Sequence, residues 1–313
     1  MNAITPRRRR LATASRRLLS LASAALLVGT FFSATGTPQA AEAASAPRIS
    51  SLKPSAGLVT GGTKVIIRGK NFSKNSNVTF DGVKAKSVKR ISSTKLSVVT
   101  PSKPGLYDGT AKVRVISGGK GSPASSKATY KYTLPKSKSY SGYGPDVLKF
   151  SKPDGSARPA ILKISHRGES NFSVVSLTND YDYNDLLVNE IGNYNGTILL
   201  DAGYSSSKST YLEIDADGEW TVEVMSGYAA PVLRPGGTAS GTVDAVYAWT
   251  GKKSTASFRY AGDSNFIVQW MTRNDSDLIV NEIGSYSGKR LVQAAPAWLT
   301  IEAVGPWTVK PKK

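Results

Sequence analysis

The sequence predicts an all-β protein in which three small β-sandwiches follow an N-terminal export signal. Three observations support this fold class. The 313 residues include 29 Gly and 16 Pro, which interrupt the chain too often for long helices. Apolar residues alternate in short runs bounded by Gly, Pro, Asn or Asp, as in strands. The C-terminal half of the chain contains one series of motifs twice, which indicates a tandem repeat.

The composition excludes several classes of site. The chain has no Cys and a single His, which excludes disulfides, Cys-based zinc sites and thiol nucleophiles. We therefore expect no cofactor and no metal. Lys and Arg number 41 against 22 Asp and Glu, a formal net charge of +19 that favours anionic partners.

Residues 1–43 are predicted to be a signal peptide. Arginines at 7–10 and at 16–17 precede an apolar stretch at 18–32, which is too short for a good membrane span. Small residues place cleavage after Ala43, which leaves a charge of +14 on the mature chain. A Sec signal and a loose twin-arginine signal both fit. Either route predicts a protein that is secreted, extracellular or in the cell envelope.

The first mature module is predicted at 47–134. Strand-like runs occur at 65–68, 78–80, 96–99 and 112–115, with turn residues between them. This spacing is typical of a small β-sandwich. The module carries 17 basic residues against two acidic ones, so most of the charge of the mature chain lies here.

One motif series runs through most of this module. It consists of Leu52-Lys53-Pro54, Gly57, Gly61-Gly62-Thr63, Val65-Ile66-Ile67, Gly69, Asn71-Phe72 and Val78-Thr79-Phe80-Asp81-Gly82. The series resembles the IPT/TIG family, and the resemblance covers 47–134. It implies an immunoglobulin-like sandwich that serves, in exported bacterial proteins, as a spacer or a sugar-associated module. Family members inside cells contact DNA, but the export signal argues against a specific nucleic-acid partner here.

Four basic residues lie close together in the sequence of this module: Lys84, Lys86, Lys89 and Arg90. We expect them to form one patch that attracts a polyanion such as teichoic acid, anionic lipid, extracellular DNA or an acidic glycan. The alternative is a scattered lysine surface that serves solubility alone.

A polar linker at 135–142 is predicted to precede two related β-sandwich domains, 143–227 and 228–313. Residues 168–174 recur as 262–268, residues 187–192 as 279–284, and residues 212–222 as 299–309. The repeat resembles domains of secreted bacterial proteins whose function is unknown. Asp217-Gly218 predicts a hairpin turn inside the first copy. The paired Trp220 and Trp307 are expected in the cores.

The second copy tests candidate catalytic motifs in the first. Gly262-Asp263-Ser264 resembles the start of an esterase motif, but the first copy has Glu169 in place of Asp263, and no Asp-x-x-His follows. Tyr260 takes the place of His166, so we expect His166 to be a partly exposed structural residue. No catalytic residue is predicted, and the chain is not expected to be an enzyme.

The loop at 179–185 of the first repeat is rich in oxygen ligands and aromatic rings. Asp180, Asp182 and Asn184 resemble the first half of a calcium loop, although the later Gly and Glu of an EF-hand are absent. Against calcium we favour an acidic, Asn-rich hairpin loop. The same loop also suits a glycan platform, in which Tyr181 and Tyr183 cover sugar rings while Asp180 and Asp182 bind hydroxyls; the alternative is exposed tyrosines without a ligand. Further aromatic residues that would extend such a platform are Tyr204, Tyr211, Trp270 and Trp298.

These features predict a secreted, non-catalytic binding protein of the cell envelope or of extracellular polysaccharide. The basic module supplies attraction to a polyanion, and the aromatic and acidic loops of the repeats add weak contacts. The first repeat carries a charge of −7 and the second +4, which predicts attraction between neighbouring modules; the alternative is that these charges serve solubility alone. The alternative is a structural or protein–protein interaction module that has no glycan site.

Overall fold

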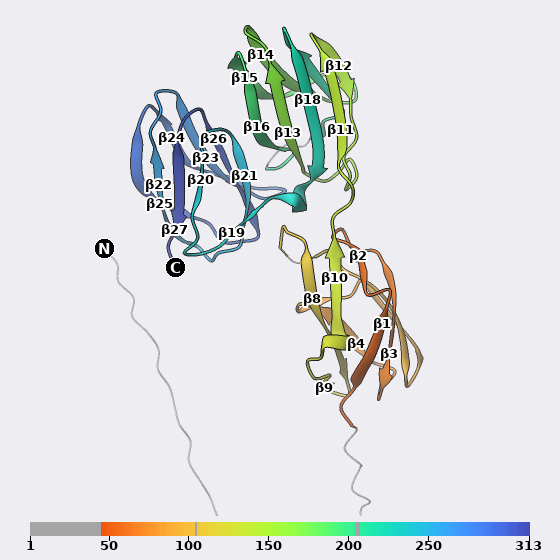
Figure 1. Cartoon of the computed structure of the whole chain (residues 1–313). Helices are drawn as coiled ribbons and strands as arrows, with labels where there is room; N and C mark the ends of the chain where they lie inside the picture. Colours follow the sequence, from red (N-terminus) through yellow and green to blue (C-terminus); the bar gives the residue numbers. More distant parts are fainter. Residues whose placement is uncertain (1–44, 104, 204–206) are drawn as a thin grey trace, which may run out of the picture. The chain divides into compact units, whose positions relative to one another are not determined.

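A computed structural model describes residues 45–103, 105–203 and 207–313 (Figure 1). Strands dominate these ranges, and the helices in them are two single 3-10 turns, η1 (Ser126–Ala128) and η2 (Gly227–Ala229). The predicted all-β fold class is confirmed. The predicted signal peptide and Tyr204 lie outside the described residues. In the described ranges, no helix has the length and apolar character needed to cross a membrane.

The first module is a sandwich of two sheets. One sheet has the order β1–β3–β7–β6, built from β1 (Arg48–Lys53), β3 (Lys64–Lys70), β7 (Lys95–Val99) and β6 (Ser87–Ser92). The other has the order β2–β10–β8–β4–β5, with β9 paired to β8. Its strands are β2 (Ala56–Leu58), β10 (Thr129–Thr133), β8 (Gly109–Ser117), β4 (Asn77–Phe80), β5 (Val83–Lys84) and β9 (Lys120–Gly121). All four strand-like runs of the sequence are strands.

Alternation along β3 explains how this core forms. Val65 and Ile67 are fully buried, while Arg68 is exposed, because successive side chains point to opposite faces of a sheet. The opposite sheet contributes Phe80 and Tyr130, whose rings meet edge to face at 5.5 Å. A Cβ atom at Gly69 would lie 2.0 Å from the Arg48 carbonyl oxygen, so the close approach of β1 requires glycine at this place in the motif.

The next sandwich contains the first repeat. One sheet has the order β11–β18–β13–β16, from β11 (Lys138–Tyr143), β18 (Glu219–Ser226), β13 (Ala160–Arg167) and β16 (Tyr194–Leu200). The other has the order β12–β17–β14–β15, from β12 (Asp146–Lys149), β17 (Tyr211–Asp215), β14 (Asn171–Leu177) and β15 (Tyr183–Ile191). Each sheet buries one face in a shared core.

Two local predictions in this region are wrong. Asp217-Gly218 does not close a hairpin, because β17 and β18 belong to different sheets. The chain crosses the sandwich there, and Leu212 and Trp220 enter the core from opposite sides. Most of the predicted flexible linker is also ordered: residues 138–142 lie in β11, which pairs with β18 along its length. Tyr140 points from β11 toward the core, and its anchoring explains why this polar segment forms a strand.

The second repeat has the same strand order. Its sheets are β19–β21–β26–β23–β24 and β20–β27–β22–β25, in which β21–β26–β23–β24 corresponds to β12–β17–β14–β15. The strands are β19 (Val232–Leu233), β20 (Ala239–Gly241), β21 (Ala245–Trp249), β22 (Ser254–Tyr260), β23 (Asn265–Met271), β24 (Ser276–Ile283), β25 (Tyr286–Val292), β26 (Ala297–Ala303) and β27 (Trp307–Pro311). Trp220 and Trp307 are buried in the two cores, as expected, and their indole nitrogens donate to the carbonyls of Gly144 and Val243 at 2.9 Å each.

Candidate binding surfaces

The outward face of sheet β1–β3–β7–β6 is strongly basic. Cross-strand pairing puts Lys53, Ile66, Ser97 and Lys89 in one row across the four strands. The adjacent row brings Arg68 directly opposite Lys95, and the row on the other side begins at Lys64. We call this surface the basic sheet face and define it by five of its cations, Lys53, Lys64, Arg68, Lys89 and Lys95.

No carboxylate of the described part of this module balances that charge. Asp81 lies in the turn after β4 of the other sheet, where it pairs with Lys103 at 3.1 Å and accepts the Lys112 backbone N–H at 2.7 Å. Asp108 precedes β8, also in the other sheet. Like charges directly opposite each other destabilise a sheet, so the Arg68–Lys95 pair favours a bound anion.

The four residues of the predicted anion patch are distributed over different parts of this sandwich. Lys84 ends β5 in the other sheet, and Lys86 lies between β5 and β6. Lys89 belongs to the basic sheet face, whereas the neighbouring Arg90 points away from it and donates its Nε–H to the Phe72 carbonyl at 2.8 Å. Sequence proximity did not reveal this split, because adjacent residues of a strand face opposite sides.

The predicted tyrosines of the first repeat lie on one outward sheet face. Register across β12–β17–β14–β15 puts Lys149, Tyr211, Leu177 and Tyr183 in one row. The ring of Tyr181 stacks on Tyr211, with centroids 4.4 Å apart and planes at 22°. We call this surface the tyrosine face. Tyr181 and Tyr183 are 60% and 67% exposed, so both reach solvent as the glycan prediction requires.

The polar groups around these rings have defined partners. The hydrogen bond between the two hydroxyls raises the pKa of Tyr181 and lowers the pKa of Tyr211. Thr178 Oγ1 accepts the backbone N–H groups of Asp180 and Asp182 at 3.2 Å each, which closes the loop that carries Tyr181. Among the described residues, no group of three or more His, Cys, Asp or Glu side chains converges on a point that could hold a metal ion.

Two further aromatic residues predicted for the platform do not reach it. Trp270 lies in the core of the second repeat, where its indole N–H donates to the Ala294 carbonyl at 3.2 Å. Trp298 is buried between the two repeats, and its indole N–H donates to the Gly227 carbonyl at 2.8 Å. Tyr211 is therefore the one predicted extension that the described residues place beside Tyr181.

His166 is buried rather than partly exposed. Its Nδ1 lies 2.8 Å from the Gly192 carbonyl, its Nε2 lies 3.3 Å from Asp217 Oδ1, and its ring stacks on Phe172. Asp217 also accepts the backbone N–H groups of Glu169 and Ser170 at 2.9 Å each, and these bonds lower its pKa. The pair thus holds the turn before β14 closed, which is a structural role.

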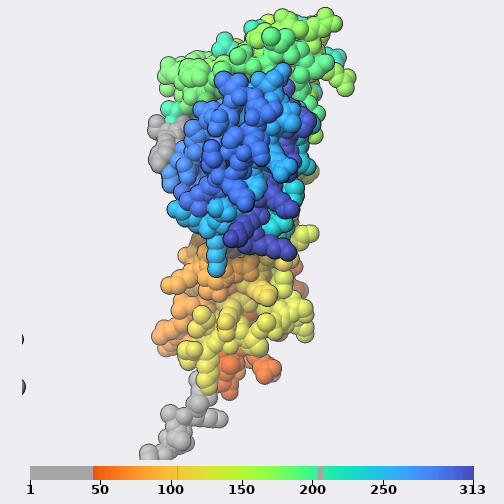
Figure 2. Space-filling view, turned by 90° about the vertical axis from the view of Figure 1, so that its left-hand side faces the viewer, coloured from red at the N-terminus to blue at the C-terminus, as the bar shows by residue number. Residues whose placement is uncertain are grey.

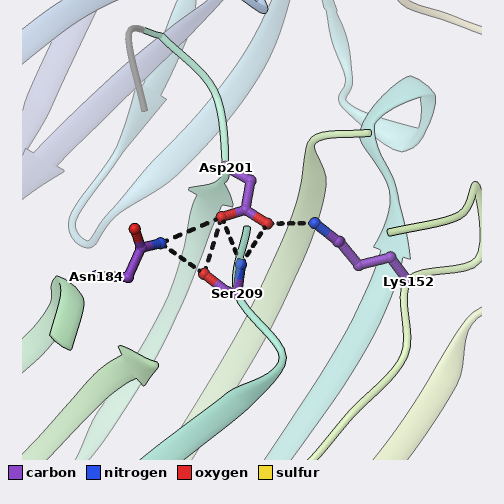
Figure 3. Close-up of polar contacts among 4 residues, drawn as sticks. All are labelled: Lys152, Asn184, Asp201 and Ser209. Atoms are coloured by element: carbon purple, nitrogen blue, oxygen red, sulfur yellow. Dashed lines mark hydrogen bonds and ion pairs between the residues drawn. The ribbon is translucent and has the colours of Figure 1, made fainter. Parts of the chain in front are cut away.

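A buried ion pair escaped the sequence analysis. Lys152 pairs with Asp201 (Figure 3). The two side chains are 2% and 0% exposed. Ser209 donates its hydroxyl to Asp201 at 2.8 Å and accepts from Asn184 at 2.9 Å. Burial lowers the pKa of Lys152, and the bond to Asp201 opposes this shift. Because 49 residues separate the two charges, no local pattern marks them as partners.

Carboxylates gather at the junction of the two repeats. Asp244 accepts the Tyr194 hydroxyl at 2.6 Å and the Ala303 backbone N–H at 2.8 Å. Glu190 and Glu302 line the same cleft, whose volume is about 310 Å³. Burial raises the pKa of all three acids, and repulsion from Asp244 adds to the shift of both glutamates.

Comparison with known families identifies the first module. Residues 47–132 match the family model for the IPT/TIG domain. This module is therefore an IPT/TIG domain, and the resemblance stated from its motif series is confirmed. No curated protein matches the chain in sequence.

Several solved structures are weakly similar to the chain. SGBP-B from a xyloglucan utilization locus of Bacteroides uniformis is 11% identical, with a TM-score of 0.23, and the match covers 57% of this chain and 72% of that one. SGBP-B from a mixed-linkage glucan locus of Bacteroides ovatus, in complex with a heptasaccharide, is 13% identical, with a TM-score of 0.22 and coverages of 57% and 54%. An auxiliary nutrient binding protein of Bacteroides ovatus is 17% identical, with a TM-score of 0.24 and coverages of 77% and 50%. Similarity at this level carries no conclusion about the ligand of this chain.

Proposed function

We propose that the protein is a secreted, non-catalytic binding protein of the cell envelope, in which the basic sheet face of the IPT/TIG domain holds an anionic polymer. The observation that carries the proposal is the arrangement of Lys53, Lys64, Arg68, Lys89 and Lys95 on one sheet face that lacks a carboxylate. The ligand class follows from the charge: a chain of phosphate or carboxylate groups, as in teichoic acids or acidic glycans.

The geometry of a sheet suits a polymer better than a single ion. Neighbouring strands lie about 4.8 Å apart, and same-face residues along a strand lie about 6.6 Å apart. The cations are therefore spaced so that successive anionic groups of a flexible polymer can each pair with one of them. A bound anion also relieves the repulsion between Arg68 and Lys95, which pair directly across β3 and β7.

The attraction is expected to depend strongly on salt. Exposed charges interact over a Debye length of about 8 Å at physiological ionic strength, and bound polyanions release counterions. Four of the five cations are exposed and Lys95 is half-buried, so added salt screens them directly.

Co-sedimentation of the mature chain with purified cell walls and insoluble acidic polysaccharides, across a salt series, tests the proposal. The test variant carries Arg68→Glu, Lys89→Glu and Lys95→Glu on the basic sheet face. We expect its apparent affinity to fall by about tenfold or more, with a shallower salt dependence.

A second variant with the same change in net charge is the control. It carries Lys84→Glu, Lys86→Glu and Lys131→Glu, which lie outside the basic sheet face. Retained binding by this variant supports the proposal. An equal loss in both variants would show attraction to overall charge without a binding face, and a larger loss in the control would move the site to the patch around Lys84 and Lys86.

A further inference from the structure

The two repeats pack on each other through unlike faces. Ile161, Leu199 and Met225 lie on the outward face of sheet β11–β18–β13–β16 in the first repeat. They pack against Val246, Ala248 and Trp298 on the outward face of sheet β21–β26–β23–β24 in the second repeat. The junction thus joins one sheet face of the first copy to the other sheet face of the second.

The second repeat contributes the face that is equivalent to the tyrosine face of the first. In the alignment of the two copies, Trp298 is equivalent to Tyr211, and Met271 is equivalent to Leu177. Strand pairing makes Val246 equivalent to Val147. Val246 is 2% exposed at the junction, whereas Val147 is 49% exposed. The same type of face is therefore covered in one copy and open in the other.

The complementary face is also open, at the other end of the repeat pair. The equivalents of Ile161, Leu199 and Met225 in the second repeat are Thr255, Leu291 and Lys312, and Leu291 is 47% exposed. Figure 2 shows the C-terminal residues of this repeat, in the darkest blue, at the surface of the molecule. The chain thus presents both halves of a repeat–repeat junction, one on each repeat.

Charge makes these two open faces complementary. On sheet β20–β27–β22–β25, Ser257 pairs with Lys289 on one side and with Lys310 on the other. We call this the C-terminal lysine face; Lys289, Lys310 and Lys312 surround a hollow of about 450 Å³ on it. The tyrosine face carries Glu213 and Asp215, both exposed on β17. The acidic side chains of the tyrosine face in one chain thus match the lysine-lined hollow in another chain.

We propose that the tyrosine face of one chain binds the C-terminal lysine face of a second copy, head to tail. The contact joins two different surfaces, so each chain keeps one free half and assembly proceeds to rings or filaments. The aliphatic contacts of the internal junction are partly replaced by Thr255 and Lys312, which makes the contact between chains weaker and more sensitive to salt than the internal one. This self-association is independent of polymer binding by the basic sheet face.

Sedimentation velocity and light scattering of the mature chain at low salt test the proposal, up to a concentration of about 1 mM, which detects a Kd in the millimolar range. We expect the average mass to rise with concentration and to return to that of the monomer at high salt. A mass that stays monomeric over the whole range would overturn the proposal.

Charge-reversal variants identify the faces. Glu213→Lys blocks the tyrosine face, and Lys310→Glu blocks the C-terminal lysine face. Each variant alone should be monomeric, and their equimolar mixture should form a discrete dimer, because one intact face remains on each chain. The controls Glu169→Lys and Lys252→Glu make the same charge changes elsewhere on the two repeats and should associate like the unchanged protein.

Two outcomes would assign the association or the face differently. If both blocked variants still associate, the contact lies on another surface and the proposal is wrong. If Tyr183→Ala abolishes polysaccharide binding while the unchanged chain stays monomeric at every concentration, the tyrosine face binds a glycan and not a second copy.

Discussion

The two repeats share one strand order but close the same end of the sandwich with different chemistry. In the first repeat, Asp201 is buried and pairs with Lys152. In the second, Gln293 takes the place of Asp201, donates its side-chain N–H to Asp277 at 3.0 Å and accepts the Trp249 indole N–H through its backbone carbonyl at 2.8 Å. The alternating apolar residues are common to both repeats and define the sandwich. The polar contact that closes its end differs: a charged closure, the Lys152–Asp201 pair, in the first repeat and a neutral closure, the Gln293 amide on Asp277, in the second.

The largest expected difference between the repeats comes from breaking the charged closure. Asp201→Asn leaves the Lys152 ammonium buried without a counter-charge, which should reduce the free energy of unfolding by about 3–5 kcal/mol. Burial already lowers the pKa of Lys152. The folded state of the variant then binds fewer protons than the unfolded state, so its stability should recover as pH rises.

The matched change in the neutral closure should matter less. Gln293→Ala removes one hydrogen bond to Asp277 and should cost about 1 kcal/mol in urea unfolding, without recovery at high pH. If the two variants lose equal stability, the buried pair is not specifically important to the first repeat and the comparison fails.

The covered and open sheet faces predict the next largest difference. Trp298→Ala empties a buried position at the junction of the repeats and should cost about 3–5 kcal/mol. Tyr211→Ala at the equivalent position of the open face should cost about 1 kcal/mol or less in the monomer, because Tyr211 is only half-buried. Thermal unfolding of both variants in dilute solution, where chains do not associate, measures the contrast. A large loss for Tyr211→Ala would show that the open face is covered within the chain.

The junction carboxylates predict a smaller, pH-dependent effect. Burial, followed by repulsion from Asp244 and Glu190, raises the pKa of Glu302 above its unfolded value of about 4.3. The folded state binds more protons at Glu302 in this range, so the contribution of Glu302 to stability is greatest below about pH 4.3 and falls as pH rises through its folded pKa. Glu302→Gln should therefore stabilise the protein at pH 7, by less than about 1 kcal/mol after solvent screening.

The control for this effect lies at the equivalent position of the first repeat. Asp215→Asn changes a carboxylate on the open tyrosine face rather than at the junction with Asp244 and Glu190, and we expect its effect on stability to stay within about 0.5 kcal/mol. Urea unfolding of both variants between pH 4 and pH 8 gives the comparison. A stability gain for Glu302→Gln that does not change with pH would contradict the assigned cause.

The smallest difference is expected where His166 and Tyr260 occupy equivalent positions. Tyr260 stacks on Phe266 and donates its hydroxyl to the Val304 carbonyl at 2.6 Å. Tyr260→Phe keeps the stack and loses this bond, so it should cost about 0.5–1.5 kcal/mol. His166→Phe also removes the contact with Asp217 and should cost more. Equal losses in chemical denaturation would mean that the Asp217 contact adds nothing.

The amino-acid sequence by itself determined the strands, the immunoglobulin-like module and the repeat. Alternation at Val65 and Ile67 is a local consequence of the pleat, and Gly69 is required by a close backbone approach within one motif. The polar stretch around Tyr181 and Tyr183 predicted their exposure, but Tyr183 begins β15 instead of lying in the predicted loop, and their role in glycan binding stays a prediction.

Only the tertiary structure decided which strands are neighbours and which charges are buried. Period-two alternation tells which residues share a face, but not that β17 and β18 enter different sheets, nor that Arg68 lies opposite Lys95. Lys152 and Asp201 are ordinary surface residue types until folding removes water from both. The free energy of a charged side chain depends on burial, nearby charges and hydrogen bonds that come from residues distant in the chain. A local sequence pattern does not contain this information.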